Sequence, residues 1–444
     1  MLIPTPRLLL VTLAGIIPMV LANSYQTALA IAGAWLLLAV VLAFIDSRFV
    51  PPASKLVWSR EYQPRLSLGV ANPLTLKLQN RSDRSATIRV RDALPPQLIH
   101  RDEPMEGACG AHSEWFFELS IVPVHRGDYD LGPLTARYLG PMGLVWLQRP
   151  APLHDRVQVY PNLLAVRDYS ALTQRRHLQQ AGVHASRQRG TGTEFERLRD
   201  YTPDDEFRRI NWPATARLHR PIAVDYQTEQ NQTVMIALDA GRRMAASAPS
   251  QDESIPPLSR LDYAVNASLL LAFVSQQYGD RVGLLGFSDR VTRYVAPRAG
   301  RGHFLTLMGA LYNLESESVE ADYAGALDYF AARNPRRSLV LLFTDLIEPE
   351  ASAALASRVT HLARRHLPLV VTLRDPEIER LAMTEPVDSQ RVYERAVAQS
   401  LLDDRAETLA RLRQRGVLTL DVAAGALSTS VINRYIEIKE RSRL

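Results

Sequence analysis

Two apolar segments near the amino terminus place the strongest limit on how this chain can fold. Residues 8–22 and 27–45 contain no charged residue, and only residues 23–26 separate them. The second segment is long enough to cross about 30 Å of hydrocarbon at about 1.5 Å per residue. The first is shorter and contains Pro18, which predicts a kink. The pattern predicts a transmembrane helical hairpin over residues 1–50.

The distribution of basic residues predicts the orientation of this hairpin. Arg7 precedes it, Arg48, Lys55 and Arg60 follow it, and residues 23–26 contain no lysine or arginine. Because the cytoplasmic flanks of membrane helices carry the excess of Lys and Arg, both ends are predicted to be cytoplasmic. The single cysteine, Cys109, cannot form an intramolecular disulfide, which fits a reducing compartment. We expect a multi-pass protein of the bacterial inner membrane whose soluble domains face the cytoplasm. The competing interpretation makes the first segment a cleaved signal peptide.

The remainder has the composition of folded domains. Of the 444 residues, 46% are hydrophobic and 22% are charged, so little of the chain is expected to be disordered. This length predicts two or three domains. The net charge of +5 arises from 52 basic and 47 acidic residues, which is weak support for nucleic-acid binding.

Residues 56–162 are predicted to form a β-sandwich of the immunoglobulin-like class. Short runs alternate apolar and polar residues, as in the sequence LTLKL at 74–78. Turn-forming pieces at 80–83, 94–96 and 125–128 separate these runs at the spacing of a small sandwich. No His, Cys, Asp or Glu group has metal-ligand spacing here, so we expect a spacer or recognition domain.

Residues 233–444 are predicted to form an α/β domain with a doubly wound, mainly parallel sheet, because apolar strands alternate with amphipathic helices. The strands are predicted at 233–238, 281–287, 291–295, 338–344, 367–373 and 417–422. The helices are predicted at 258–277, 302–314, 323–333, 349–366, 390–415 and 428–439. The last helix gathers its apolar residues on one side and should dock on the domain.

Asp239 and Asp345 each follow a predicted strand and should approach each other at the carboxyl ends of the sheet. This arrangement resembles the Rossmann-like von Willebrand factor A fold, whose metal-ion-dependent adhesion site (MIDAS) uses Asp-x-Ser-x-Ser, a later threonine and a second aspartate. Here a glycine and Arg243 replace the serines, and Ala321 lies near the position of the threonine. A guanidinium there would repel a divalent cation. We expect a degenerate site without metal, in which the aspartates cap helices or pair with Arg242 or Arg243.

Residues 163–232 form an arginine-rich connector with a distinctive motif: GTGTEF at 190–195, LRDY at 198–201, DD at 204–205, RRINW at 208–212 and ATAR at 214–217. This combination resembles the signature of the bacterial domain of unknown function numbered fifty-eight, although members usually have a glycine at position 204. The resemblance implies binding roles for Glu194, Phe195, Arg199, Tyr201, Asp205, Arg209, Trp212 and Arg217. It also implies partnership with MoxR-type AAA+ ATPases and other von Willebrand A-like proteins in assembly, maturation or envelope functions.

Several interpretations of the motif charges stay open. They can pair internally as an ion-pair network, form a protein-docking surface, or form a phosphate or nucleic-acid site. The Gly190-x-Gly192 pair lacks the lysine and third glycine of phosphate loops. Arg290 replaces the second glycine of a nucleophile elbow. His361 and His366 lie five residues apart on one predicted helix, face different directions, and are expected at the surface.

These observations predict a membrane-anchored, non-enzymatic adaptor whose α/β domain presents its strand-end crevice to protein partners. We expect no catalytic residue, no cofactor and no nucleic-acid partner, and we expect lipid contact through the hairpin. The alternative is a metal-ion-dependent binding or hydrolytic module that holds Mg²⁺ or a similar cation with Asp239 and Asp345.

Overall fold

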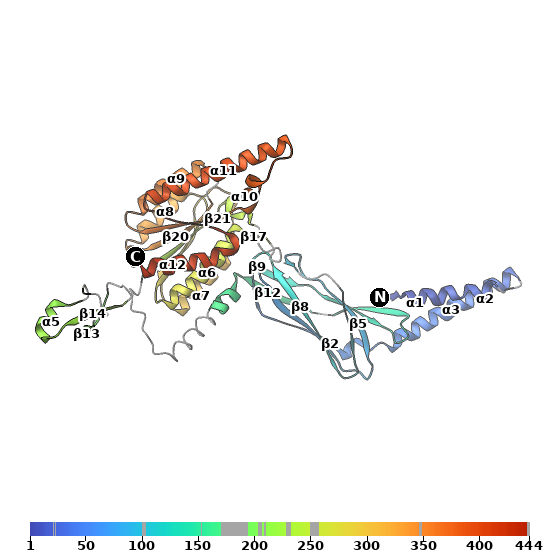
Figure 1. The fold of residues 1–444 in the computed structure, drawn as a ribbon. Coiled ribbons are helices and arrows are strands. Elements are labelled where there is room, and N and C mark those ends of the chain that lie inside the picture. The colour runs from blue at the N-terminus through green and yellow to red at the C-terminus, as the bar shows by residue number, and fades with distance from the viewer. Residues whose placement is uncertain are drawn as a thin grey trace. The chain divides into compact units, whose positions relative to one another are not determined.

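The computed structural model describes all residues except 21, 23, 100–103, 152, 170–193, 203–206, 208–209, 228–231, 249–256, 346–348 and 442–444. The described residues group into two compact units, Met1–Tyr160 and Pro161–Leu444, whose elements are labelled in Figure 1.

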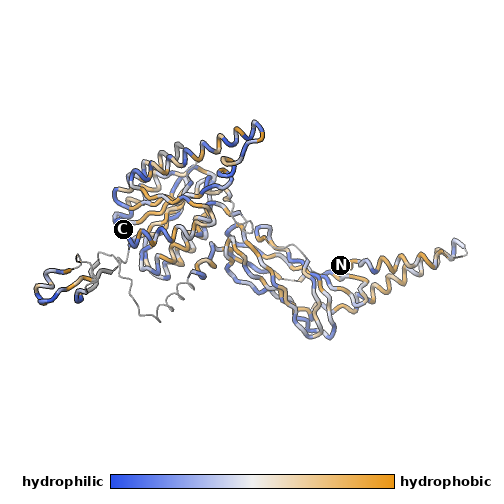
Figure 2. The backbone as a smooth tube through the Cα atoms, in the orientation of Figure 1, coloured by the Kyte–Doolittle hydropathy of each residue, from blue (hydrophilic) through white to orange (hydrophobic). Residues whose placement is uncertain are grey.

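The first unit begins with apolar helices. α1 (Pro6–Ala14) and α2 (Ile16–Val20) follow one another and pack against α3 (Tyr25–Phe49). Among the described residues, the helix that starts at Tyr25 is the one long and apolar enough to cross a membrane. Figure 2 shows the hydrophobic colouring along these helices. The long apolar helix predicted from the sequence is therefore present. α1 and α2 are shorter, so a second membrane crossing by these two helices stays a prediction.

The break in the first apolar segment lies at Gly15, between α1 and α2, and Pro18 lies inside α2. The Pro18 ring disturbs the preceding turn, because it lacks the N–H that would bond to the carbonyl four residues earlier. At the break, the Gly15 N–H donates to Thr12 O over 3.2 Å. Val11 O instead accepts a 2.9 Å hydrogen bond from Trp35 Nε1 on α3. A side chain at Gly15 would overlap the Trp35 ring, so the glycine permits this close packing.

The β-domain consists of mainly antiparallel sheets. The first contains β1 (Leu2–Pro4), β11 (Val145–Ala151), β10 (Leu134–Leu139), β5 (Ala86–Asp92) and β7 (Met105–Cys109). The second contains β2 (Leu56–Tyr62), β4 (Asn72–Asn80), β8 (Glu114–Pro123) and β6 (Leu98–Ile99). The third contains β3 (Arg65–Ser67), β12 (Asp155–Tyr160) and β9 (Gly127–Leu131). Leu74, Leu76 and Leu78 alternate into the core from β4, which confirms the strand predicted there.

Arg60 is buried inside this domain. From β2 its guanidinium contacts Asp92 on β5 and Asp155 on β12, the latter over 3.0 Å, so one side chain joins three sheets. Its charge is neutralised within the β-domain. The basic residues left to orient the hairpin are Arg7, Arg48 and Lys55.

Both ends of the helical segment are bound to the turn between β10 and β11. Asp46, fully buried near the end of α3, accepts hydrogen bonds from Met142 N at 2.7 Å and Leu144 N at 2.9 Å. Thr5, which precedes α1, donates through Oγ1 to Gly143 O at 2.7 Å and Leu144 O at 2.9 Å. β1 adjoins Thr5 and pairs with β11, so the segment before the first helix belongs to the β-domain sheet.

The second unit is built on a sheet in the order β19-β18-β15-β20-β21-β22, parallel except for edge strand β19. Its strands are β15 (Thr233–Asp239), β18 (Arg281–Phe287), β19 (Val291–Arg298), β20 (Leu339–Phe343), β21 (Leu367–Arg374) and β22 (Leu418–Ala423). Its helices are α6 (Arg260–Gln277), α7 (Arg301–Tyr312), α8 (Tyr323–Arg333), α9 (Pro349–Leu362), α10 (Pro376–Met383), α11 (Ser389–Gln414) and α12 (Leu427–Glu440). Shorter elements are η3 (Arg242–Ala245), β16 (Ser247–Ala248), β17 (Leu258–Ser259) and η4 (Ala424–Ala426).

The predicted alternation of strands and helices is present, with corrections at α6, α9 and α10. α9 ends at Leu362, before the predicted end at residue 366. α10 was not predicted, and α6 begins at Arg260 because Ser259 caps it by accepting the Asp262 N–H over 3.0 Å. α12 packs on α6, and its Tyr435 is fully buried, which confirms the predicted docking of the last helix. Lys439 on α12 lies 2.7 Å from the carboxylate of fully buried Asp280, just before β18, and Tyr435 Oη also donates to this carboxylate.

The connector contains the short helix α5 (Trp212–Leu218) and two strands. β13 (Glu194–Asp200) and β14 (Ile222–Gln227) pair in antiparallel register. Asn211 caps α5 by accepting the Ala214 N–H over 3.0 Å.

Candidate functional site

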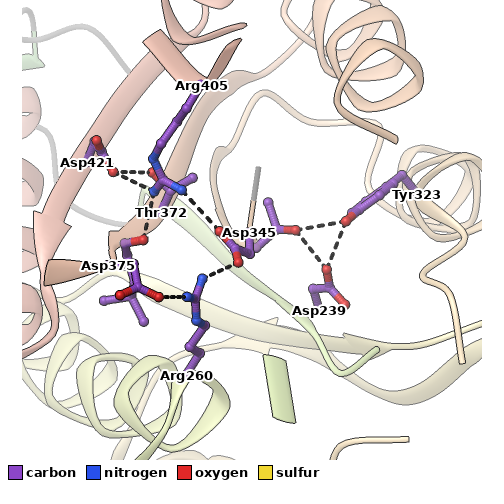
Figure 3. Close-up of polar contacts among 10 residues, drawn as sticks. Asp239, Arg260, Tyr323, Asp345, Thr372, Asp375, Arg405 and Asp421 are labelled. Atoms are coloured by element: carbon purple, nitrogen blue, oxygen red, sulfur yellow. Dashed lines mark hydrogen bonds and ion pairs between the residues drawn. The ribbon is translucent and has the colours of Figure 1, made fainter. Parts of the chain in front are cut away.

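Four aspartates gather at the carboxyl ends of adjacent strands in the second unit (Figure 3). Asp239 ends β15, Asp345 and Asp375 closely follow β20 and β21, and Asp421 lies in β22. The strands are parallel neighbours, so their carboxyl ends share one edge of the sheet. The sequence prediction had singled out only the first two.

Two arginines join three of these carboxylates into a chain of ion pairs. Arg260, the first residue of α6, contacts Asp345 through Nη1 and Asp375 through Nη2, the latter over 2.8 Å. Arg405 on α11 contacts Asp345 over 3.2 Å and Asp421 over 2.7 Å. Asp345 is 3% exposed and therefore lies buried between two guanidinium groups. Burial alone would lower the pKa of Arg405, but its carboxylate partners raise that pKa above the ordinary value.

Asp239 has a different environment. Its Oδ1 accepts the Gly241 N–H over 2.8 Å. Its Oδ2 accepts hydrogen bonds from Tyr323 Oη over 3.0 Å and Thr344 Oγ1 over 2.7 Å. Burial raises the pKa of Asp239, against the opposing effects of these three donors and of the charge on Arg243. Burial also raises the pKa of Tyr323, so its hydroxyl keeps its proton and donates it.

These contacts correct one expectation about the degenerate site and add further partners to another. The sequence predicted an aspartate without hydroxyl companions, but Tyr323 and Thr344 supply hydroxyls from other positions. It also offered Arg242 or Arg243 as pairing partners for the aspartates. Both of these arginines form ion pairs with Glu320, at 2.5 Å and 3.4 Å respectively. Asp345 has guanidinium partners on α6 and α11.

The same geometry tests whether the site fits the divalent cation of a von Willebrand A-like domain. The described residues contain no group of three or more His, Cys, Asp or Glu side chains arranged to hold a metal. Two guanidinium groups contact Asp345, where a cation ligand would be required, and their charges oppose a metal ion. The described residues at this edge of the sheet therefore do not fit a metal ion.

A pocket of about 220 Å³ opens beside the ion pairs. Arg260 and Arg405 line one part of it, and Ile378, Leu401 and Leu409 from α10 and α11 line another. The Nε atoms of both arginines are buried and have no hydrogen-bond partner among the described residues. The pocket therefore combines charged side chains of both signs, including Arg374, Glu379 and Arg413, with an apolar wall, which suits an element carrying both a charged and an apolar group.

The eight connector residues are placed only in part. Asp205 and Arg209 lie outside the described residues, and Glu194 and Phe195 are described only as backbone in β13. Arg199 lies in β13, with Tyr201 directly after it, and Trp212 and Arg217 lie in α5. The structure therefore brings these last four residues into one small element.

Trp212 is 58% exposed and lies edge-on to Phe207, itself 68% exposed, with ring centroids 5.6 Å apart. Asp200 pairs with Arg220 over 3.0 Å, and both side chains are more than half exposed. The described part of the element therefore presents an aromatic pair and exposed charges.

The second unit is thus a mainly parallel α/β sheet with a closed, ion-paired strand-end site. Residues 197–393 match the family model described as "Protein of unknown function DUF58". This match contains Arg199, Trp212, Asp239 and Asp345, and it ends before Arg405.

The chain is also similar to curated proteins and, over about a quarter of its length, to solved structures. Uncharacterized proteins of Mycobacterium bovis and Mycobacterium tuberculosis are each 26% identical over 239 residues, covering 52% of this chain and 72% of the relative. A segment of Escherichia coli alpha-2-macroglobulin is 16% identical, with a TM-score of 0.21, and covers 26% of this chain and 17% of its own. The ASH/PapD-like domain of human CEP192 is 14% identical, with a TM-score of 0.19, and covers 25% of this chain and 87% of its own. At such TM-scores, these likenesses to solved structures support no argument.

Proposed function

We propose that this chain is a membrane-anchored, non-enzymatic adaptor that binds protein partners, with a MoxR-type AAA+ ATPase as the principal one. The observation that carries the proposal is the enclosure of Asp345 between Arg260 and Arg405. In a von Willebrand A-like domain, which we propose for residues 233–444, this aspartate would serve the cation. Here its charge is satisfied within the protein, so the crevice is suited to a protein surface.

The anchoring part of the proposal has a geometric support. Thr5 and Asp46 are hydrogen-bonded to the same turn of the β-domain, for which we propose an immunoglobulin-like fold. If α3 crosses a bilayer, the residues before α1 must lie on the same side as the end of α3. The α1–α2 segment must therefore cross the membrane as well, in the direction opposite to α3. With the flanking residues Arg7, Arg48 and Lys55, this favours a multi-pass inner-membrane protein with cytoplasmic domains.

Two surfaces of the second unit suit a partner. The pocket beside Arg260 and Arg405 offers charged side chains and an apolar wall. The exposed Phe207 and Trp212 form an aromatic pair of the kind that supplies the central contacts of protein interfaces. Arg199, Arg217 and Arg220 lie in the same element, which favours an acidic rim on the partner. Other von Willebrand A-like proteins are further partners implied by the family resemblance.

We expect Trp212→Ala to weaken binding of the ATPase by about thirtyfold or more, since central aromatic residues commonly contribute about 2 kcal/mol or more to an interface. The full chain in detergent would be mixed with the MoxR-type ATPase encoded nearest to its gene, with and without a non-hydrolysable ATP analogue. Bound ATPase would then be titrated by pulldown. The matched control is Phe116→Ala, which removes an aromatic side chain of similar exposure from the β-domain. Failure of the unaltered chain to retain the ATPase, or equal retention by Trp212→Ala, contradicts the proposal.

Calorimetric titration of the full chain with Mg²⁺, Mn²⁺ and Ca²⁺ should be flat, because a bound cation would have to displace Arg260 from Asp345. This measurement separates the adaptor from the alternative module that uses Asp239 and Asp345 to hold a metal. Saturable binding that disappears in Asp239→Ala would support that alternative and count against the adaptor.

A further inference from the structure

A polar pocket of about 410 Å³ lies where α3 meets the β-domain. Ser47, Arg48, Val50 and Pro52 contribute to it from the end of α3 and the residues after it. The remaining lining residues are Lys55, Ser82, Asp83, Arg84 and Arg149. Four basic side chains therefore surround one acidic side chain, and all of them lie in the first unit.

Two of the four basic side chains are fixed by the backbone. Arg84 Nη1 donates to Arg48 O over 2.9 Å, and Arg149 Nη1 donates to Pro51 O over 2.8 Å. Each of these arginines keeps further N–H groups for a second acceptor, because a guanidinium has five. The pocket thus has two prepositioned donors at the last turn of a long apolar helix.

The other two basic side chains, Arg48 and Lys55, are exposed and form no hydrogen bond or ion pair with the part of the chain that the structure describes. Asp83 is engaged by His112, whose Nε2 lies 2.7 Å from it. This hydrogen bond, together with the charge of Lys55, lowers the pKa of Asp83. The pocket consequently keeps a surplus of three positive charges, counting four basic residues against one ionised aspartate.

The position of the pocket identifies the class of ligand. Arg48 follows the apolar segment by three residues, and Phe49 beside it is 50% exposed with Arg84 over its ring. If α3 crosses a bilayer, this level coincides with the phosphate groups of the leaflet. Basic residues directly after a membrane helix attract anionic lipid head groups.

We propose that this pocket binds the phosphate of an anionic phospholipid, with Arg84 and Arg149 as fixed donors and Arg48 and Lys55 closing over the head group. The inference rests on the proposed membrane anchoring. A soluble phosphate compound would offer the same oxygen chemistry, so the test must separate the two sources. A bound lipid would fix the first unit against the leaflet at the point where Asp46 already clamps α3 to the β-domain.

The test is a titration of the full chain in a neutral detergent with phosphatidylglycerol or phosphatidylcholine, counting retained lipids by native mass spectrometry. We expect selective, salt-sensitive retention of phosphatidylglycerol. The double variant Arg48→Gln/Lys55→Gln should lose about fivefold in affinity for each charge removed. The variant Arg48→Lys/Lys55→Arg, which keeps both charges, should retain the lipid. The matched control is Lys77→Gln/Arg156→Gln, which removes two charges elsewhere in the β-domain and should leave retention unchanged.

Equal retention of the two lipids, or full retention by Arg48→Gln/Lys55→Gln, overturns the proposal. Displacement of phosphatidylglycerol by inorganic phosphate or glycerol 3-phosphate at similar concentrations overturns the assignment to a lipid. Flotation of the chain with liposomes of phosphatidylcholine alone tests the anchoring separately. If the chain floats but shows no preference for phosphatidylglycerol, only the proposed lipid pocket is contradicted. If the chain does not float, the proposed membrane anchoring is contradicted.

Discussion

Replacing Asp345 with alanine should lower the free energy of unfolding of the second unit by about 3–5 kcal/mol. Removing Asp345 takes the buried carboxylate away from two desolvated guanidinium groups, which then keep only the more exposed Asp375 and Asp421 as partners. Here one carboxylate serves both Arg260 and Arg405, whose side chains are 4% and 11% exposed. Thermal unfolding of the full chain, followed by near-ultraviolet circular dichroism, would measure the effect at about 2–4 °C for each kcal/mol. A melting temperature within 2 °C of the unaltered chain would contradict the ion-pair account.

Asp239→Asn is the matched comparison, and its cost at neutral pH should be much smaller. The amide can still accept the Gly241 N–H, and it can donate to Thr344 or Tyr323, whose hydroxyls can turn to accept. Because burial raises the pKa of Asp239, the folded protein holds the carboxyl proton of Asp239 more tightly than the unfolded chain does. The resulting stability is fully present below the unfolded pKa, near 4, and is lost as the pH rises through the folded pKa. Asp239→Asn should remove this acid-side contribution.

Replacing Lys439 with methionine should cost a similar amount, about 3–5 kcal/mol, at the opposite end of the sheet. Asp280 is fully buried, and Lys439 is the cation within 2.7 Å of both of its oxygens. Tyr435 and the Gln232 N–H remain as donors in the variant, but neither carries charge. Loss of this pair should loosen α12 from α6, and the melting temperature of the full chain measures that loss.

The double variant Asp280→Asn/Lys439→Met gives this second prediction its control. Replacing both members removes the unpaired charge, so a large part of the lost stability should return. Arg434→Met serves as a surface comparison, because Arg434 pairs with Glu437 where both side chains are partly exposed. It should change stability by less than about 1 kcal/mol. If the double variant is as unstable as Lys439→Met alone, the unpaired charge of Asp280 is not the cause of the lost stability.

The sequence predicted the strands of the α/β sheet well because buried parallel strands are continuous runs of Val, Ile and Leu, as in β20. It did not predict the partners of Asp345. Arg260 and Arg405 lie 85 and 60 residues away along the chain, and single-sequence patterns carry no information about such pairs. It also missed α10, an eight-residue helix that begins at Pro376 after its capping residue Asp375, because this start resembles a turn in isolation.

His366 illustrates a second kind of error. The sequence placed it at the surface of a helix over 349–366, but α9 ends at Leu362. The argument from helical faces therefore does not apply to it. His366 is 4% exposed and packs against Phe330, with ring centroids 5.0 Å apart, and burial lowers its pKa. The motif at residues 190–217 identified the connector as distinctive, but it did not predict the β13–β14 hairpin.

The strand before α1 has a consequence for biosynthesis. Thr5 and its partner Gly143 lie 138 residues apart in the chain, so the ribosome delivers β1 long before β11 exists. At typical translation speeds this delay is on the order of ten seconds, which leaves time for the apolar helices to insert. If these helices insert as proposed, the sheet must then be completed by a strand already tethered to the lipid. Folding of the β-domain would thereby wait for membrane integration, and a chain that failed to insert would expose an unpaired sheet edge to chaperones and proteases.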